Sequence, residues 1–435
     1  MHGGSMIAIV GGRVLMSNDG GAPAHSVGGA NVLIQGDRIV RVDAAQPPPD
    51  AQVIDATGLT VLPGLIDMHT HFIRPLDMEL FVRQGITSVR FAGTALGAVA
   101  DLRRRVVRGE IPGPRIFSCG PHLDEPPTAW PEFTVEVTGP EDAPAAVIRL
   151  IEAEADALIV IQRISPATLA VITGTAHERG VPVTGQTWTT SVREAVIAGM
   201  DGVENTARLP EDPALAREWI EGYRSIGHRL ARLVRLWQSA PQGMIDEVLA
   251  LMAARGTDWT PAICSFADWA GLTDAPVAKL PAYALLSAEA RVAIPASRAR
   301  QTEGWSQADR DNTRAAIEQM QHAVATFHQL GGAIAVGTDA HPGGLFYHLE
   351  LAYLAAAGLS NAAVLAAATK GGARALRRGS DLGTIEAGKL ADLIAIDGDP
   401  LRDLSALQRV RHTLVAGRPV VVDGQVEHGS LLPNR

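Results

Sequence analysis

Residues 61–71 read Val-Leu-Pro-Gly-Leu-Ile-Asp-Met-His-Thr-His, an apolar run that ends in two histidines separated by one residue. Side chains alternate between the two faces of a β-strand, so His69 and His71 are expected to project to the same side. Neutral imidazole is the commonest metal ligand among protein side chains. The stretch therefore predicts a strand whose end holds half of a metal-binding or catalytic site.

The alternation of an apolar strand with a helical stretch continues from residue 61 to residue 339, which is typical of βα units around a parallel sheet. The expected strands lie at 61–71, 87–91, 115–119, 158–162, 181–186, 202–205, 258–263 and 333–339. Expected helices include 143–155, 166–179, 191–198 and 313–330. Eight such strands over roughly 280 residues fit an α/β fold of the (β/α)₈ barrel type, whose active site forms at the C-terminal ends of the strands.

The two ends of the chain have a different sequence pattern. Residues 6–58 alternate short apolar stretches with Gly, Pro and Asp turns, and the same pattern returns from residue 390. Neither stretch is long enough to bury a core alone, so we expect them to pair into one small β-sandwich. The predicted domains are residues 1–60 with 380–435, and the barrel at 61–379, with an excursion at 267–307 over the barrel mouth.

Composition narrows the class of partner and compartment. The chain has 435 residues and a formal net charge of −9, which argues against nucleic acid or an anionic membrane as a partner. No apolar run is long enough to span a membrane, and the N-terminus lacks the basic start of a signal peptide. Cys119 and Cys264 are the only cysteines, so a cytoplasmic protein without disulfides is expected. The sequence leaves the oligomeric state open, a homo-oligomer included.

Four stretches together resemble the amidohydrolase superfamily, in particular its imidazolonepropionase- and prolidase-like branch. The first is the opening stretch at 62–71, and the others are Ala-His-Glu-Arg-Gly-Val-Pro-Val at 176–183, Gly-Thr-Asp-Ala at 337–340, and Leu-Gly-Thr-Ile-Glu-Ala-Gly-Lys from 382 leading into Asp-Gly-Asp-Pro at 397–400. Their order and spacing cover nearly the whole chain. The resemblance implies the same barrel with a catalytic site at its mouth.

The resemblance also implies the roles of individual residues. In this family one divalent metal lies on the histidine pair of the first strand and the aspartate of the eighth, which correspond to His69, His71 and Asp339. A second metal lies on histidines of strands five and six, and a carbamylated lysine or a carboxylate of strand four bridges the two ions. The metal activates a water molecule, and the aspartate moves its proton.

The chain departs from this pattern at the second metal. Ile159, Gln186 and Asn205 stand at the positions of the strand-four, strand-five and strand-six ligands, and the first lysine of the chain is Lys279. Neutral amide oxygens are poor substitutes for imidazole or thiolate on zinc. We therefore expect at most one divalent metal (Zn, Fe or Mn) on His69, His71 and Asp339, and a metal-free site stays open.

Polar residues at the expected barrel mouth are candidates for substrate binding. Gln186 and Asn205 would either orient the substrate by hydrogen bonds or simply fill the vacated pocket. His122 follows the third expected strand and His341 follows the eighth, so both are expected on the functional rim.

Aromatic residues are the second group of candidates. Trp130, Trp188, Trp269 and Trp305 lie after expected strands or in the excursion, although only 4% of the chain is aromatic. Tryptophans fill ordinary cores as well. At a barrel mouth they would favour a hydrophobic or aromatic small molecule as the substrate.

These patterns leave three functions to compare. The first is hydrolysis of an amide, another C–N bond or a lactone at one metal, with His69, His71 and Asp339 as catalytic residues. The second is metal-independent acid–base catalysis of a cyclisation, elimination or isomerisation, as in secondary metabolism, at the same three residues. The third is an inactive protein that binds a small molecule.

Overall fold

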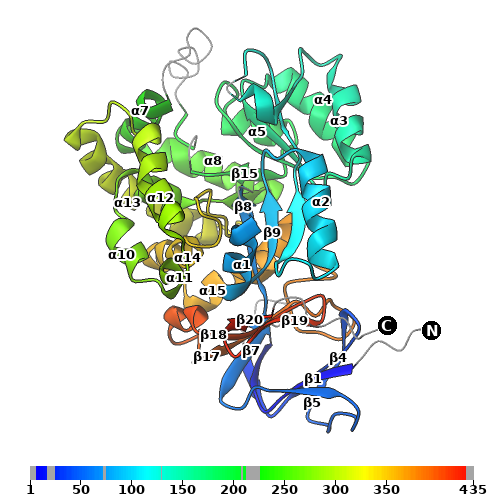
Figure 1. Cartoon of the computed structure of the whole chain (residues 1–435). Coiled ribbons are helices and arrows are strands. Elements are labelled where there is room, and N and C mark those ends of the chain that lie inside the picture. The colour runs from blue at the N-terminus through cyan, green and yellow to red at the C-terminus, as the bar shows by residue number, and fades with distance from the viewer. Residues whose placement is uncertain are drawn as a thin grey trace.

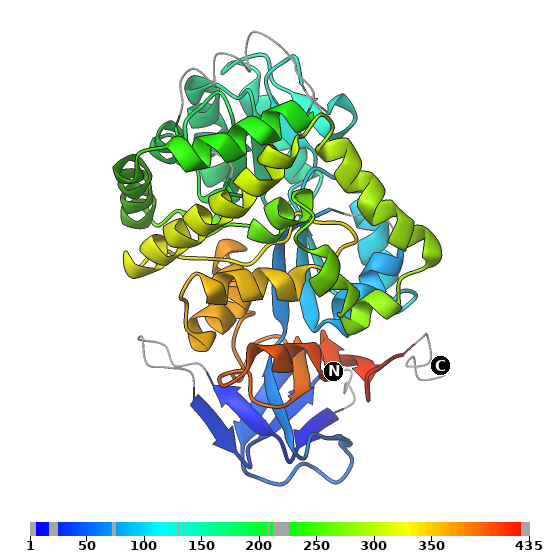
Figure 2. The same ribbon diagram turned by 90° about the vertical axis from the view of Figure 1, so that its left-hand side faces the viewer.

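The computed structural model describes residues 6–16, 25–71, 75–128, 130–206, 209–211 and 226–427. Figure 1 shows two parts: β-sheets built from both ends of the chain, and above them a larger α/β part. Figure 2 shows the same division from the side, with long helices covering the α/β part. Among the described residues, no helix combines the length and the apolar character that crossing a membrane requires.

Two sheets form the lower part. The strand order is β5-β4-β1-β6 in the first sheet and β20-β19-β18-β17-β7-β2-β3 in the second. The strands are β1 (Met6–Val10), β2 (Arg13–Met16), β3 (His25–Gly28), β4 (Asn31–Gln35), β5 (Arg38–Asp43), β6 (Gln52–Asp55), β7 (Leu59–Pro63), β17 (Leu393–Asp397), β18 (Val410–Val415), β19 (Arg418–Val422) and β20 (Gln425–Val426).

One hydrophobic core joins these two sheets. It contains Ile7 and Val32 from the first sheet and Val61, Leu393 and Leu414 from the second. Strand β17 pairs antiparallel with β7, so the second sheet holds residues from both ends of the chain. This is the arrangement that the matching sequence pattern of the two ends predicts, while the exact domain boundaries stay a prediction.

The larger part contains parallel strands that alternate with helices. Their order is β10-β9-β8 in one sheet and β12-β11-β13-β14-β15-β16 in the other. The strands are β8 (Leu65–Thr70), β9 (Ile86–Phe91), β10 (Arg115–Ser118), β11 (His122–Asp124), β12 (Thr134–Glu136), β13 (Leu158–Gln162), β14 (Val183–Thr187), β15 (Gly202–Glu204) and β16 (Asp258–Thr260). Strands β8, β9 and β13 are buried along their whole length, the polar residues of β8 and β9 included, which is usual for parallel strands covered on both faces.

Helices flank these strands and extend beyond them. They are α1 (Pro75–Arg83), α2 (Leu96–Val107), α3 (Ala143–Glu152), α4 (Pro166–His177), α5 (Val192–Ile197), α7 (Ile226–Ser239), α8 (Gln242–Arg255), α13 (Gln307–Gln329), α14 (Tyr347–Ala356), α15 (Asn361–Ala366) and α16 (Gly372–Ala375). The expected excursion is itself helical and contains α9 (Ile263–Trp269), α10 (Asp274–Ala278), α11 (Pro281–Ala284) and α12 (Ala288–Gln301).

The segment 333–339 is not a regular strand, although the sequence predicts one there. Only an isolated parallel bridge joins Ile334 to Trp259 of β16. On its other side, Met68 N of β8 donates to Val336 O at 2.8 Å. Gly337 explains the close but irregular fit, because a Cβ at this position would lie 2.4 Å from Thr260 and 2.8 Å from His69. The segment therefore lies between β16 and β8 without a continuous ladder, and a closed eight-stranded barrel stays a prediction.

Candidate active site

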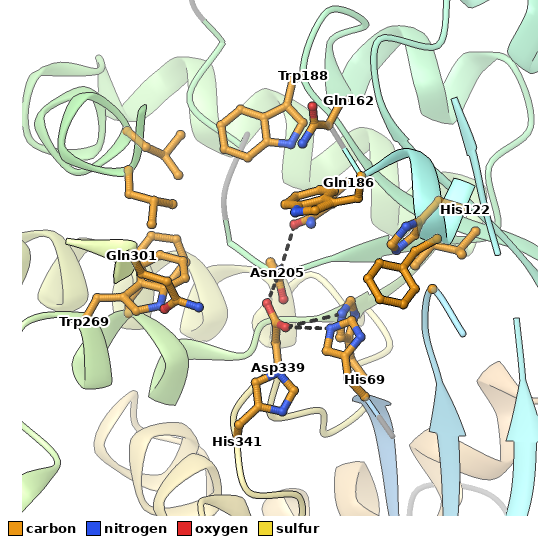
Figure 3. Close-up of a pocket in the computed structure, with 18 of the residues that line it drawn as sticks. His69, His122, Gln162, Gln186, Trp188, Asn205, Trp269, Gln301, Asp339 and His341 are labelled. Atoms are coloured by element: carbon orange, nitrogen blue, oxygen red, sulfur yellow. Dashed lines mark hydrogen bonds and ion pairs between the residues drawn. The ribbon is translucent and has the colours of Figure 1, made fainter. Parts of the chain in front are cut away.

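The end of β8 brings His69 and His71 together, with ring centroids 5.4 Å apart. His69 Nδ1 lies 2.8 Å from Glu204 Oε2, and His71 Nδ1 lies 2.8 Å from the backbone oxygen of Ala92. The Nε2 atoms of both rings are turned to Asp339 Oδ1, at 3.7 Å and 3.0 Å respectively. Figure 3 shows the dashed lines that converge on Asp339.

The backbone of segment 333–339 holds Asp339 in position. Asp339 N donates to His69 O at 2.8 Å, and Asp339 adopts a positive φ of 43°. Thr338 Oγ1 donates to Asp67 Oδ2 at 2.9 Å, which ties the same segment to β8. This left-handed backbone is uncommon for a residue other than glycine and is found most often at functional sites.

Charge interactions set the ionisation of Asp339. Burial raises its pKa, but the nearby His69 and the hydrogen bond from His71 outweigh burial and hold the pKa well below its usual range. For His71, burial lowers the pKa, but the hydrogen bond and charge of Asp339 outweigh it and leave the pKa raised. Asp339 is thus a carboxylate at neutral pH.

Glu204 and Arg90 are buried site residues that the sequence analysis missed. Arg90 Nη2 and Thr184 Oγ1 both donate to Glu204 Oε1, while Oε2 of the same carboxylate faces His69. Burial raises the pKa of Glu204, but the charge of Arg90 and the hydrogen bond with His69 lower it to about 2. A signal was present, because each residue is a charged side chain within an expected strand, Arg90 in 87–91 and Glu204 in 202–205.

Asn205 and Gln186 form a neutral hydrogen-bonded pair beside Asp339. Asn205 follows β15 with a φ of 62°, and its Nδ2 donates to Gln186 Oε1 at 2.7 Å and to Asp339 Oδ2 at 2.9 Å. Ile159 of β13 is buried and lines the same cavity. Ile159, Gln186 and Asn205 thus line one cavity and present a hydrocarbon side chain and two amides to it.

These contacts show whether the residues present fit a bound metal ion. Within the described part of the chain, the group able to hold an ion is His69, His71 and Asp339, whose ligand atoms all lie within 4.8 Å of one another. The second nitrogen of each ring has a carboxylate or carbonyl partner, which is the arrangement that fixes metal-binding histidines. The residues fit one divalent ion, and the amide pair does not fit a second.

A cavity of about 390 Å³ opens above this group. Most of the candidate substrate-binding residues line it: Gln186, Asn205, His122, His341, Trp130, Trp188 and Trp269. Trp305 instead packs against the main core. Other residues that line the cavity lack a motif and come from distant segments, so the sequence does not single them out. They are Phe133, Gln162, Leu230, Leu233, Phe266 and Gln301.

Two further histidines line the cavity together with this group. His341 packs 5.5 Å from His71, measured between ring centroids. His122 is buried, and burial together with the charges of His71 and His69 lowers its pKa to about 3. Gly93 makes room for the His122 ring, since a Cβ there would lie 2.2 Å from Cε1. His122 is thus a neutral hydrogen-bonding group at neutral pH.

Comparison with known proteins places this geometry in a family. Residues 60–420 match the profile of the amidohydrolase family. Matches to curated sequences are local: the dihydroorotase of Streptococcus thermophilus (strain CNRZ 1066) is 52% identical over 46 residues, which are 11% of each chain. The imidazolonepropionase of Aromatoleum aromaticum is 49% identical over 75 residues, which are 16% of this chain and 18% of that protein. The chain thus spans about a tenth to a fifth of these relatives.

A solved structure matches over nearly the whole length. It is a prolidase in complex with N-methylphosphonate-L-proline, and its TM-score is 0.71 at 20% sequence identity. The match covers 96% of this chain and 100% of the prolidase chain. At this identity the similarity shows a common fold.

Proposed function

The chain belongs to the amidohydrolase family, and from this premise we propose that it hydrolyses an amide-type bond of a hydrophobic small molecule with one divalent metal. His69, His71 and Asp339 would hold the ion. The observation that supports this most is the pair of contacts at the far ring nitrogens, His69 to Glu204 and His71 to Ala92 O, each at 2.8 Å. These contacts direct both Nε2 atoms to Asp339, where a metal would bind.

The proposal treats the parallel strands as one (β/α)₈ barrel. Backbone hydrogen bonds support this reading at both breaks between the sheets. Asp156 N donates to Ser118 O at 2.8 Å, next to β10 and β13, and the segment 333–339 bonds to both β16 and β8. The site would then lie at the C-terminal ends of the strands, where barrel enzymes place their catalytic groups.

The residues of the chain would divide the reaction between them. A bound Zn²⁺, Fe²⁺ or Mn²⁺ supplies Lewis acidity and lowers the pKa of water. Asp339, held as a carboxylate, accepts the proton of the attacking water as the water oxygen bonds to the carbonyl carbon. Asp339 then returns that proton to the leaving nitrogen as the C–N bond breaks. Glu204 keeps the proton of His69 on Nδ1, so that Nε2 has a free lone pair.

The cavity wall supports a hydrophobic substrate. Trp188, Trp269 and Phe266 are buried and line the cavity, and His122 adds a neutral polar group. Aromatic rings of this kind bind flat apolar groups by stacking and by excluding water. An aryl or similarly apolar group on the substrate would lie on this side, away from Asp339.

One observation favours a second candidate, metal-independent acid–base catalysis. His71 Nε2 and Asp339 Oδ1 are 3.0 Å apart, and their pKa values shift in opposite directions, upward for His71 and downward for Asp339. Such a pair can exchange a proton with a substrate without any ion. Cyclisation, elimination or isomerisation would then replace hydrolysis.

Metal analysis and an anilide assay separate the two candidates. Protein purified without added metal is analysed for its metal content and assayed on N-(4-nitrophenyl)acetamide before and after dialysis against a chelator. We expect about one ion per chain, hydrolysis that the chelator abolishes, and recovery on adding Zn²⁺, Fe²⁺ or Mn²⁺. Hydrolysis that survives complete removal of metal contradicts the metal mechanism. Protein that binds no ion and does not hydrolyse the anilide favours the second candidate.

A further inference from the structure

The hydrogen bonds from Asp339 through Asn205 to Gln186 have a fixed polarity. The Asp339 carboxylate can only accept, so the amide atom 2.9 Å from its Oδ2 is Asn205 Nδ2. An NH₂ group can only donate, so the Gln186 atom 2.7 Å from the same Nδ2 is Oε1. The Nε2 end of Gln186 is therefore the end that turns away from Asn205.

Asn205 is held too firmly to reverse this polarity. Its backbone N donates to Thr260 O at 2.8 Å, and its backbone O accepts from Trp259 Nε1 at 3.1 Å. The residue is only 3% exposed to solvent. With the backbone pinned on both sides and the side chain enclosed, the Nδ2 group stays directed at Asp339 and Gln186.

Gln186 Nε2 is an unused donor at the cavity. Within the described part of the chain, no hydrogen bond involves this atom, whereas Oε1 of the same side chain is occupied. Gln186 is half-buried and lines the cavity together with His69, His71 and Asp339. Figure 3 shows Gln186 on the cavity wall above Asn205, with dashed lines joining Asn205 to Gln186 and to Asp339. A ligand in the cavity would therefore meet an N–H donor on this wall.

We propose that Gln186 Nε2 donates a hydrogen bond to the carbonyl oxygen of the scissile bond. This assignment rests on the proposed function, because it places the substrate carbonyl in the cavity that Gln186 lines together with His69, His71 and Asp339. When the water oxygen bonds to the carbonyl carbon, the C=O electron pair moves to the oxygen and the water proton moves to Asp339. A donor oriented in advance stabilises that developing negative charge. The position that relatives give to a second metal would thus hold a neutral oxyanion donor.

The proposal predicts that the cavity distinguishes two molecules of similar size. Acetanilide and N-ethylaniline differ only in a carbonyl group that replaces a CH₂ group. We expect the wild-type protein to bind acetanilide more tightly, as measured by the dissociation constants of both compounds in ligand-observed NMR titrations. A single hydrogen bond is worth about a 5- to 10-fold difference in affinity.

Two substitutions of Gln186 test the donor. Gln186→Glu keeps an oxygen for Asn205 Nδ2 but presents a second oxygen to the cavity, and Gln186→Leu removes both groups. We expect both to lose the preference for acetanilide, while N-ethylaniline binds as before. Gln321 lies far along α13 and donates to Tyr353 O at 3.2 Å, so Gln321→Leu is a matched control that keeps the preference.

The outcomes separate this proposal from the proposed function. A wild-type protein without a preference for acetanilide, or a preference that persists in Gln186→Glu, overturns the donor assignment. If the preference depends on Gln186 but hydrolysis does not depend on metal, the metal mechanism falls and the donor assignment stands. If hydrolysis depends on metal but the preference is absent, only the donor assignment falls.

Discussion

The two halves of the cavity floor hold their polar groups by different means. On one side His69, His71 and Asp339 are joined to a buried ion pair of Glu204 and Arg90. On the other side Gln186 and Asn205 form a neutral pair next to the hydrocarbon of Ile159. In the charged half the charged side chains have partners of opposite charge. The side chains of the neutral half carry no charge and need no such partner.

The comparison shows two ways of keeping buried polar groups satisfied. A buried charge needs a partner, at a cost of several kcal/mol for each unpaired ion. The amides of Gln186 and Asn205 avoid that cost, because they hydrogen-bond to each other and to Asp339.

The largest effect is expected where the two halves meet, at Asp339. Asp339→Asn removes the proton acceptor and a charged ligand, so we expect kcat/KM to fall by about 10³-fold or more. The check is the hydrolysis rate of the variant after metal is added. The exposed Asp423, which pairs with Arg411 at 2.8 Å, provides the control substitution Asp423→Asn. A variant that keeps full turnover would remove Asp339 from the mechanism.

The support of the charged half is tested at Glu204. Glu204→Gln keeps the shape but weakens the hold on His69, and we expect metal affinity to fall by about 10- to 100-fold. Competition with a chromogenic chelator measures that affinity. Asp201 bonds to His177 at 2.7 Å outside the cavity lining, so Asp201→Asn is a matched control. Equal losses in both variants would mean that the Glu204 contact has no special role.

Replacing the neutral residues by metal ligands tests whether their side chains exclude a second ion. The triple variant Ile159→Lys/Gln186→His/Asn205→His restores the ligand types that the family resemblance implies. We expect metal content to rise from about one to about two ions per chain, as measured by elemental analysis. The double variant Gln321→His/Asn361→His, remote from the site, controls for added histidines. No gain in metal would show that the backbone, not the side chains, prevents a second ion.

The smallest effect is expected at Glu350. Glu350 is buried, accepts from Cys264 N at 2.7 Å, and burial raises its pKa from 4.5 to about 7. The folded state therefore binds more protons than the unfolded state between pH 4.5 and 7, and Glu350 lowers stability as the pH rises through this range. Glu350→Gln removes that contribution.

We expect the variant to gain stability relative to the wild type from pH 4.5 to pH 7, by roughly 1–3 kcal/mol. Urea unfolding of both proteins at several pH values measures the difference. Asp124, whose pKa is also raised by burial, acts equally in both proteins and cancels. The pKa of Asp67 is raised partly by the charge of Glu350, so its change belongs to the effect of the substitution. Parallel stability curves would contradict the assignment to Glu350.

The sequence alone predicts His69, His71 and Asp339 as parts of one site, because these residues lie in motifs. The spacing of His69 and His71 predicts their common face, and the structure places both beside Asp339. The placement of Gln186, Asn205 and Ile159 around one cavity also follows from the alternation of strands and helices.

The contacts that support the site could not be predicted in the same way. Glu204 and Arg90 lie 114 positions apart, and only tertiary packing shows that they meet. The segment 333–339 has the composition of a strand, but it forms only an isolated bridge to β16, with Gly337 packed closely against Thr260 and His69. The polarity of Gln186 depends on Asp339, which no local pattern reveals.

The pairing of β17 with β7 has a consequence for synthesis of the protein. Strand β7 runs through Gly64 directly into β8, so it is made early together with His69 and His71. Its hydrogen-bonding partner β17 leaves the ribosome about 330 residues later, which takes roughly 20–70 s at bacterial or eukaryotic rates. During that time one edge of β7 has only water or other chains to pair with. Translation speed and chaperones therefore bear directly on the yield of the folded site.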